Sequence, residues 1–168
     1  MANNCAYDMK IIGSKASCLE WLRLMTTSTS ENAFHRFYEA YVYDESGTEQ
    51  DYCLYITGDC AWSLDTCRSS SGKSELPDLF AFNSKRLGII MEAWSAEPGL
   101  CFQEHFIYDI GECKADECLE WEEFYWDKRE CPTYAEYKQK YQDVPPEDEF
   151  SDDYAERGGF DNYGEWTI

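Results

Sequence analysis

Residues 5–12 read Cys-Ala-Tyr-Asp-Met-Lys-Ile-Ile, and Gly13 follows them. Apolar and polar side chains alternate along this stretch, which predicts a strand that ends at the glycine. Directly after it, Ser17 stands three residues before Glu20, the spacing of a capping box at the start of a helix. We therefore predict a short amphipathic helix over residues 17–26, with a buried face that carries Cys18, Trp21, Leu22 and Met25.

Similar signals continue through the middle of the chain. Residues 34–44 and 52–62 are rich in aromatic and β-branched side chains and flank a turn around Ser46-Gly47, which predicts a hairpin. A helical turn over residues 63–68 and a Ser-rich loop over 69–72 follow. Pro77 suits the start of a second helix and Gly88 its end, with a strand over residues 89–95 next. The buried side of that second helix is expected to carry Leu79, Phe80 and Leu87.

The last part of the chain is expected to add a second hairpin, a helix and a tail. The hairpin pairs residues 101–109 with 113–126, and a short helix begins at Pro132. Pro145-Pro146 ends the ordered pattern, and the acidic residues after it read as a tail. The order β-α-β-β-α-β with these additions predicts an α+β, ferredoxin-like sandwich. We place this domain at residues 1–142 and the acidic, aromatic-containing tail at 143–168.

The net charge is the strongest functional signal in the sequence. The chain has 34 acidic and 14 basic residues, a formal net charge of −20, and residues 104–168 hold 20 of the acids. Phosphate groups and anionic membranes attract positive charge, so we expect neither direct nucleic-acid binding nor membrane binding. The charge points instead to a basic protein or a cation as partner, although an acidic surface can also serve solubility alone.

The role expected of the cysteines depends on the cellular compartment, which decides whether their thiols stay reduced. The start of the chain has no signal-peptide pattern, and no run approaches the roughly 18 apolar residues of a membrane helix. We therefore expect a cytoplasmic protein, in which thiols stay reduced. The nine cysteines are then either small buried groups or metal ligands.

One set of cysteines and a histidine could hold zinc. Cys101 and His105 fall on one face of their strand, because side chains alternate along it. A hairpin that is symmetric about Ile110-Gly111 places residue 103 opposite residue 118, which brings Cys118 to the same face. The sequence predicts a closed, structural zinc site drawn from Cys60, Cys67, Cys101, His105 and Cys118. The alternative is that these cysteines belong to the core and that His105 is a half-buried histidine.

A second set of residues could bind a basic partner. Residues 120–127 read Glu-Trp-Glu-Glu-Phe-Tyr-Trp-Asp, and such mixtures of aromatic and charged side chains are typical of protein interfaces. An edge strand with half of its aromatics buried would show the same pattern. The acidic tail could lie along a basic groove, or it could be a solvating end. The candidate partner-binding residues are Glu120, Glu122, Glu123, Asp127, Glu147, Asp148, Glu149, Asp152 and Asp153.

The sequence carries no pattern typical of catalysis. Its two histidines are His35 and His105, and Cys101 lies too far from His105 along a strand for a direct thiol–imidazole pair. A nucleophile elbow, a phosphate-binding glycine loop and EF-hand spacing are all missing from the sequence. We expect a protein that is not an enzyme, with a metalloenzyme that keeps an open coordination position as the catalytic alternative.

Four short segments of the chain resemble a known family. They are residues 1–5 (Met-Ala-Asn-Asn-Cys), 58–63 (Gly-Asp-Cys-Ala-Trp-Ser), 95–99 (Ser-Ala-Glu-Pro-Gly) and 102–106 (Phe-Gln-Glu-His-Phe). In order and spacing they resemble the YubB ferredoxin-like family of phages, plasmids and other mobile elements, over roughly residues 1–126. The resemblance implies a fold and a setting in the cytosol of a bacterial host, with no enzymatic activity.

In size and charge the chain is also similar to acidic anti-CRISPR proteins. Type II effectors hold guide and target in a positively charged channel, which attracts an anion. We therefore expect a phage or mobile-element protein that binds and inhibits a type II CRISPR effector nuclease by blocking DNA loading. The alternative is an acidic binding module for a different basic host protein, with structural zinc and no catalysis.

Overall fold

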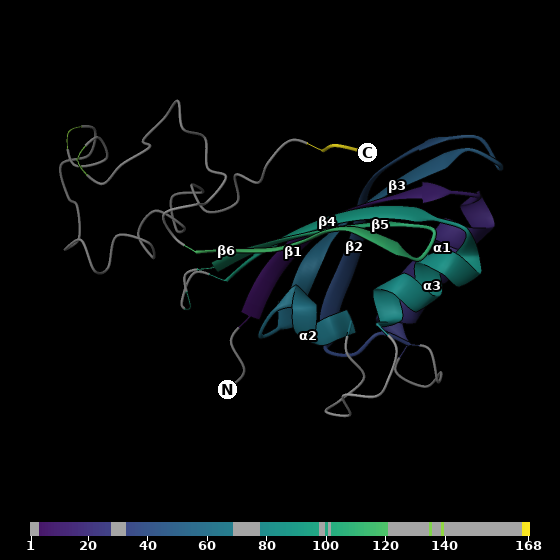
Figure 1. The fold of residues 1–168 in the computed structure, drawn as a ribbon. Coiled ribbons are helices and arrows are strands. Elements are labelled where there is room, and N and C mark those ends of the chain that lie inside the picture. Colours follow the sequence, from purple (N-terminus) through teal and green to yellow (C-terminus); the bar gives the residue numbers. More distant parts are fainter. Residues whose placement is uncertain are drawn as a thin grey trace.

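A computed structural model describes residues 4–27, 33–68, 78–97, 100, 102–120, 135, 139 and 166–168 of the chain. Its elements are β1 (Asn4–Gly13), α1 (Lys15–Thr26), β2 (Phe37–Gly47), β3 (Tyr52–Ala61), α2 (Leu64–Arg68), α3 (Leu79–Leu87), β4 (Ile90–Glu97), β5 (Phe102–Asp109) and β6 (Glu112–Glu120). Within these residues, six strands form one antiparallel sheet of order β2-β3-β1-β4-β5-β6. The α+β class predicted from the sequence is confirmed (Figure 1).

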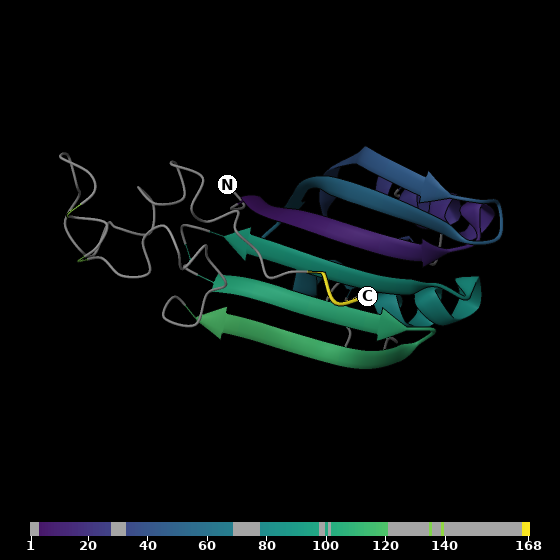
Figure 2. The same cartoon turned by 90° about the horizontal axis from the view of Figure 1, so that it is seen from above.

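The described helices α1, α2 and α3 lie on one face of the sheet, and residues 166–168 lie against the other (Figures 1 and 2). We name this second face, which no described helix covers, the open face. Alternation along β1 sorts its side chains between the two faces: Tyr7, Met9 and Ile11 are buried under the helices. Asp8 and Lys10 alternate with them, so they point to the open face, and both are only partly buried.

Aromatic side chains hold the helices on the sheet. Trp21 of α1 lies 4.6 Å from the ring of Phe34, which lies 5.3 Å from Phe80 of α3. The Trp21 indole N–H points at the sulfur of Met9, 3.2 Å away on the central strand β1. Tilted and edge-to-face pairs of this kind add to the stabilisation from burying large apolar surfaces.

The ends of the helices follow local capping chemistry. The Ser14 hydroxyl accepts the backbone N–H of Ser17 at 3.2 Å and caps α1, so the predicted cap at Ser17 was wrong by one turn. The Ser17 hydroxyl instead donates to the carbonyl oxygen of Leu87 at 2.8 Å. Asp78 caps α3, which ends at Gly88 with φ 64°, as predicted for a glycine stop.

The second hairpin departs from the predicted register. Tyr108 lies opposite Cys113 as expected, but a bulge between Ile107 and Tyr108 shifts the rest of the pairing by one residue. Cys118 therefore lies opposite Glu104, whereas the symmetric hairpin placed it opposite residue 103. A shift of one residue moves every later side chain to the other face of a strand, so Cys118 and His105 face opposite ways.

Some predicted parts lie outside the described residues. These are the Ser-rich loop, the helix from Pro132 apart from positions 135 and 139, and the acidic tail up to residue 165. Within the described ranges, no helix combines the length and apolar character needed to cross a membrane.

Gly58 allows β1, β2 and β3 to approach closely. The hydroxyl of Tyr7 donates to the carbonyl oxygen of Glu39 at 2.7 Å, and this contact passes beside Gly58. A Cβ atom at residue 58 would lie 2.0 Å from the Glu39 oxygen and 2.8 Å from the Tyr7 hydroxyl. Such distances require a shift of the backbone of β2.

We predict that Gly58→Ala lowers the free energy of unfolding by about 3 kcal/mol or more, at the upper end of overpacking costs. The matched control is Gly88→Ala, where a Cβ meets no atom within 4 Å and only the positive φ is unfavourable. The control should cost about 1 kcal/mol. Urea denaturation measures both, and equal losses would show that the approach at Gly58 is not tight.

Candidate functional site

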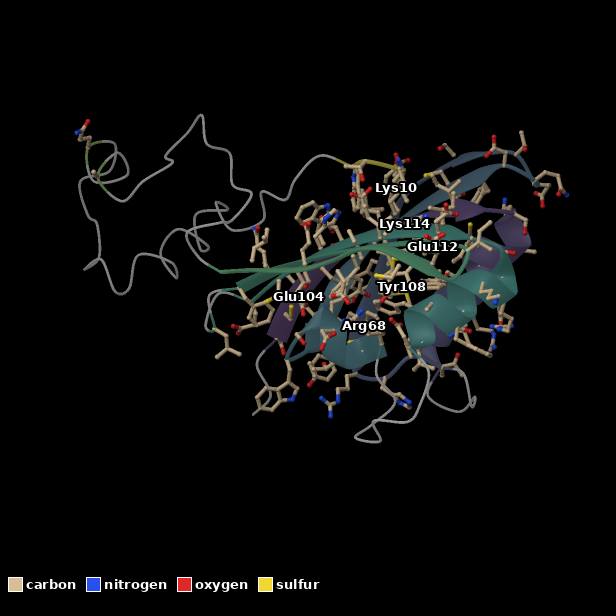
Figure 3. The ribbon with its side chains drawn as sticks, in the orientation of Figure 1. Lys10, Arg68, Glu104, Tyr108, Glu112 and Lys114 are labelled. Carbon is tan, nitrogen blue, oxygen red and sulfur yellow. The ribbon has the colours of Figure 1, made fainter. Side chains whose placement is uncertain are left out.

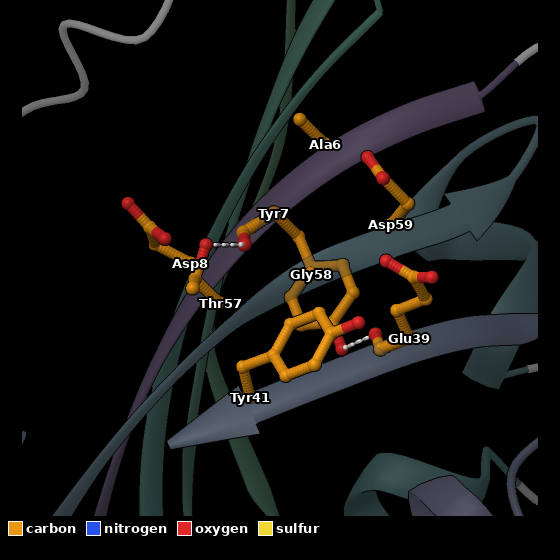
Figure 4. Close-up of a pocket in the computed structure, with 8 residues that line it drawn as sticks. All are labelled: Ala6, Tyr7, Asp8, Glu39, Tyr41, Thr57, Gly58 and Asp59. Carbon is orange, nitrogen blue, oxygen red and sulfur yellow. Dashed lines mark hydrogen bonds between the residues drawn. The ribbon is translucent and has the colours of Figure 1, made fainter. Parts of the chain in front are cut away.

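A hollow lies on the open face where β1, β3 and β2 run side by side (Figure 4). Its volume is about 340 Å³, and its lining is Ala6, Tyr7, Asp8, Glu39, Tyr41, Thr57, Gly58 and Asp59. We name it the acidic hollow.

The pairing of the strands assembles the acidic hollow from distant parts of the sequence. Asp8, Thr57 and Tyr41 form one row across the three strands. Ala6, Asp59 and Glu39 form the next row, so three carboxylates gather on one side of the sheet. Burial and then the nearby charge of Glu39 raise the pKa of Asp59. A cation in the hollow would relieve this repulsion.

Tyr41 lines the acidic hollow, and further exposed aromatic side chains lie on the same strand. They lie on β2, an edge strand of the described sheet with bulges after Phe37 and Val42. Tyr41 is 58% exposed, and Tyr38 and Tyr43 are exposed to a similar degree. Large exposed apolar side chains beside charges are typical of interaction surfaces. The sequence predicts a hairpin for this stretch but not that its tyrosines are exposed, although their number was a usable signal.

A second polar centre of the open face is the fully buried carboxylate of Glu92 on β4. Its Oε1 lies 2.9 Å from Nε2 of His105 and accepts the Thr167 hydroxyl at 3.2 Å. Its Oε2 accepts the backbone N–H groups of Thr167 at 2.7 Å and Ile168 at 3.1 Å. Burial alone raises the pKa of Glu92, but the hydrogen bonds from His105, Thr167 and Ile168 outweigh it and lower that pKa.

The position of His105 on the open face separates it from Cys118, Cys60 and Cys67, the predicted zinc ligands that the structure describes. Its ring stacks on Trp94 at 3.8 Å, and its Nδ1 lies 3.4 Å from Glu117. Cys118 instead lines a smaller hollow of about 250 Å³ on the helix side, together with Glu104.

Two of the predicted ligands do come together, but with a different third cysteine. Cys60 lies beside Cys67 and Cys5, and all three are fully buried. Hydrogen bonding with Cys5 and Cys67, and then burial, raises the pKa of the Cys60 thiol far above its ordinary value. Neutral thiols of this kind pack as small apolar groups. Cys101 lies outside the described residues, and the described part holds no group of three or more His, Cys, Asp or Glu arranged for a metal ion.

The predicted partner-binding residues are mostly outside the described residues. The backbone of Glu120 ends β6. Nothing is described for the other eight, which are Glu122, Glu123, Asp127, Glu147, Asp148, Glu149, Asp152 and Asp153. The acidic surface that the structure describes is therefore a different one, on β1, β2 and β3.

Glu104 is a second buried carboxylate, on the helix side of the sheet (Figure 3). It accepts the Ser95 hydroxyl at 2.6 Å and the backbone N–H groups of Leu64 at 2.7 Å and Asp65 at 3.3 Å. These donors place it at the start of α2, where it caps the helix. Burial is the main cause that raises the pKa of Glu104.

Nearby, Arg68 gathers several partners on the same side of the sheet (Figure 3). Its guanidinium donates to Asp116 at 2.8 Å and to the Tyr108 hydroxyl at 2.6 Å, and it lies over the Phe106 ring at 4.7 Å. These contacts fasten α2 to β5 and β6. Buried charges in this region are thus satisfied within the fold, which argues for a structural role.

Comparisons with known proteins found no match for the chain among family models, curated proteins or solved structures.

We predict that Glu104→Ala lowers the free energy of unfolding by about 1–3 kcal/mol, because it leaves the Leu64 N–H and Ser95 hydroxyl without their acceptor. Glu104→Gln keeps an acceptor oxygen and should cost less. The wild type should also gain stability relative to Glu104→Gln as the pH falls through the raised pKa of Glu104, because the folded state then binds that proton more tightly than the unfolded chain. Denaturation at several pH values tests this, and equal losses in the two variants would contradict it.

Zinc stays a prediction. If the protein holds structural zinc, the purified protein contains the metal, and a chelator lowers the melting temperature, because binding energy is then folding energy. Elemental analysis and melting curves with and without chelator measure both. A metal-free protein with an unchanged melting curve would contradict the zinc site.

Proposed function

We propose that the protein acts by binding a basic protein partner on its open face. The observation that carries this proposal is the acidic hollow, in which Asp8, Glu39 and Asp59 converge beside exposed tyrosines. With a net charge of −20, the whole chain also attracts a basic surface over a distance. Such attraction raises association rates and orients the partner before contact.

The acidic hollow suits a lysine or arginine side chain of the partner. A cation between Asp8 and Asp59 gains from both charges, and the mutual repulsion of Glu39 and Asp59 falls when it binds. Tyr41 lies on the rim and offers a ring face for a cation–π contact. Exposed aromatics on β2 then supply the apolar contact area that charges alone lack.

We further propose that the partner is a type II CRISPR effector nuclease, in which a basic channel must stay open for DNA to load. Support comes from the charge and from the sequence resemblance to mobile-element proteins. A ferredoxin-like core belongs to the same proposal: β1 to β4 would form it, with β5 and β6 added beside β4. A different basic host protein is the alternative partner for the same face.

The test compares two triple variants that remove the same charge. Asp8→Asn/Glu39→Gln/Asp59→Asn neutralises the acidic hollow. Glu49→Gln/Asp51→Asn/Glu112→Gln neutralises exposed acids at the β2–β3 and β5–β6 turns. We predict that the hollow variant binds the effector about tenfold or more weakly, a difference of about 1.4 kcal/mol. The turn variant should lose much less, because it alters only the long-range field.

Binding is measured by calorimetry, and inhibition by a DNA-cleavage assay in which the protein is added before or after the target. Inhibition only on addition before the target agrees with blocked loading. If the protein does not inhibit cleavage in either order of addition, the proposal that the effector is the partner is overturned. The alternative, a different basic host protein, would then be tested. Equal losses in the two triple variants would overturn the acidic hollow as the binding site.

A further inference from the structure

Residues 166–168 (Trp-Thr-Ile) lie across the open face and contact three neighbouring strands (Figures 1 and 2). Tyr55 of β3, Lys10 of β1 and Glu92 of β4 form one row in the sheet register. Trp166 meets Tyr55 with ring centroids 6.2 Å apart, and the Ile168 carbonyl oxygen accepts a hydrogen bond from Lys10. Thr167 and Ile168 donate to Glu92.

Glu92 depends on this segment for most of its hydrogen bonds. Among the described residues, its carboxylate accepts from Thr167 twice, from Ile168 once and from His105 once. Without residues 166–168, the carboxylate would keep only His105 of these partners. A buried carboxylate that lacks donors is costly, so the position demands N–H and O–H groups from outside the sheet.

The contacts define the chemistry that the position selects. One carboxylate oxygen accepts two successive backbone N–H groups, so the backbone turns both groups to the same side and proline fits at neither residue. The hydroxyl of Thr167 reaches the other oxygen, which favours serine or threonine there. An aromatic side chain before it packs against Tyr55, whose ring also lies 5.8 Å from the Lys10 amine.

The same contacts resemble those of a bound ligand. Residues 166–168 add no strand to the sheet, and their recorded hydrogen bonds go to the side chains of Glu92 and Lys10. Every ladder between neighbouring strands is therefore complete without them.

We propose that the row Tyr55–Lys10–Glu92 is a peptide-binding site for an aromatic–hydroxyl–aliphatic segment, which residues 166–168 of this chain occupy. The same segment supplied as a separate peptide competes for the site. This inference does not depend on the basic partner, since Tyr55, Lys10 and Glu92 are not among the residues that line the acidic hollow.

The test uses the full chain with Thr167→Pro, which removes both donors of residue 167 and leaves the sheet unaltered. The probe is a labelled peptide of residues 164–168 (Gly-Glu-Trp-Thr-Ile), followed by fluorescence anisotropy. We expect saturable binding to this variant and at least tenfold weaker binding to the wild type, in which the tethered segment competes at high effective concentration. Adding Glu92→Gln to the variant should abolish most of the binding. A control peptide with proline in place of threonine should not bind.

Three results would overturn the proposal. The peptide fails to bind the folded Thr167→Pro chain, it binds equally well with Glu92→Gln, or the proline peptide binds as tightly. If Thr167→Pro does not fold, hydrogen exchange on the wild type decides: fast exchange at the Thr167 and Ile168 amides overturns the site. Slow exchange at both amides that becomes fast in Glu92→Gln supports it. If the wild type forms dimers and the peptide dissociates them, that result would also support the site. Residues 166–168 of one copy would then be bound by the other copy.

Discussion

The described helices cover only one face of the sheet, and this constraint shapes every other feature of the molecule. Because side chains alternate along a strand, successive residues of each strand go to the covered face and to the open face in turn. On β1 this sorts Tyr7, Met9 and Ile11 from Asp8 and Lys10. The same sorting on β2 and β3 brings carboxylates together, so the acidic hollow is a consequence of how the strands pair.

Each face of the sheet holds a buried carboxylate that needs hydrogen-bond donors, and the two carboxylates obtain them from different parts of the chain. Glu104, under the helices, takes its donors from Ser95 and the start of α2, which are parts of the folded domain. Burial dominates there and raises its pKa. On the open face, no described helix lies above Glu92, which takes its donors from His105 and from residues 166–168. Those hydrogen bonds outweigh burial, so its pKa is lowered and the carboxylate stays charged.

The open face thus offers two kinds of recognition that lie close together on β1. Around Asp8 the chemistry is electrostatic and suits a cationic side chain. Around Lys10, two residues further along the strand, it is directional and suits the backbone groups of a short peptide segment. Long-range attraction supplies speed and orientation, whereas hydrogen bonds to a buried carboxylate supply selectivity for sequence and conformation.

The sequence by itself determined the elements whose signals are local. Alternation in residues 5–12 and the glycine at Gly88 depend on near neighbours in the chain, so the class of fold and most element bounds could be predicted. Residues brought together by strand pairing could not. Asp8, Glu39 and Asp59 meet only in the folded sheet, Glu92 finds Thr167 75 residues away, and one bulge after Ile107 turned Cys118 away from His105. Register depends on the packing of the whole sheet, and a single extra residue reverses the face on which every later side chain falls.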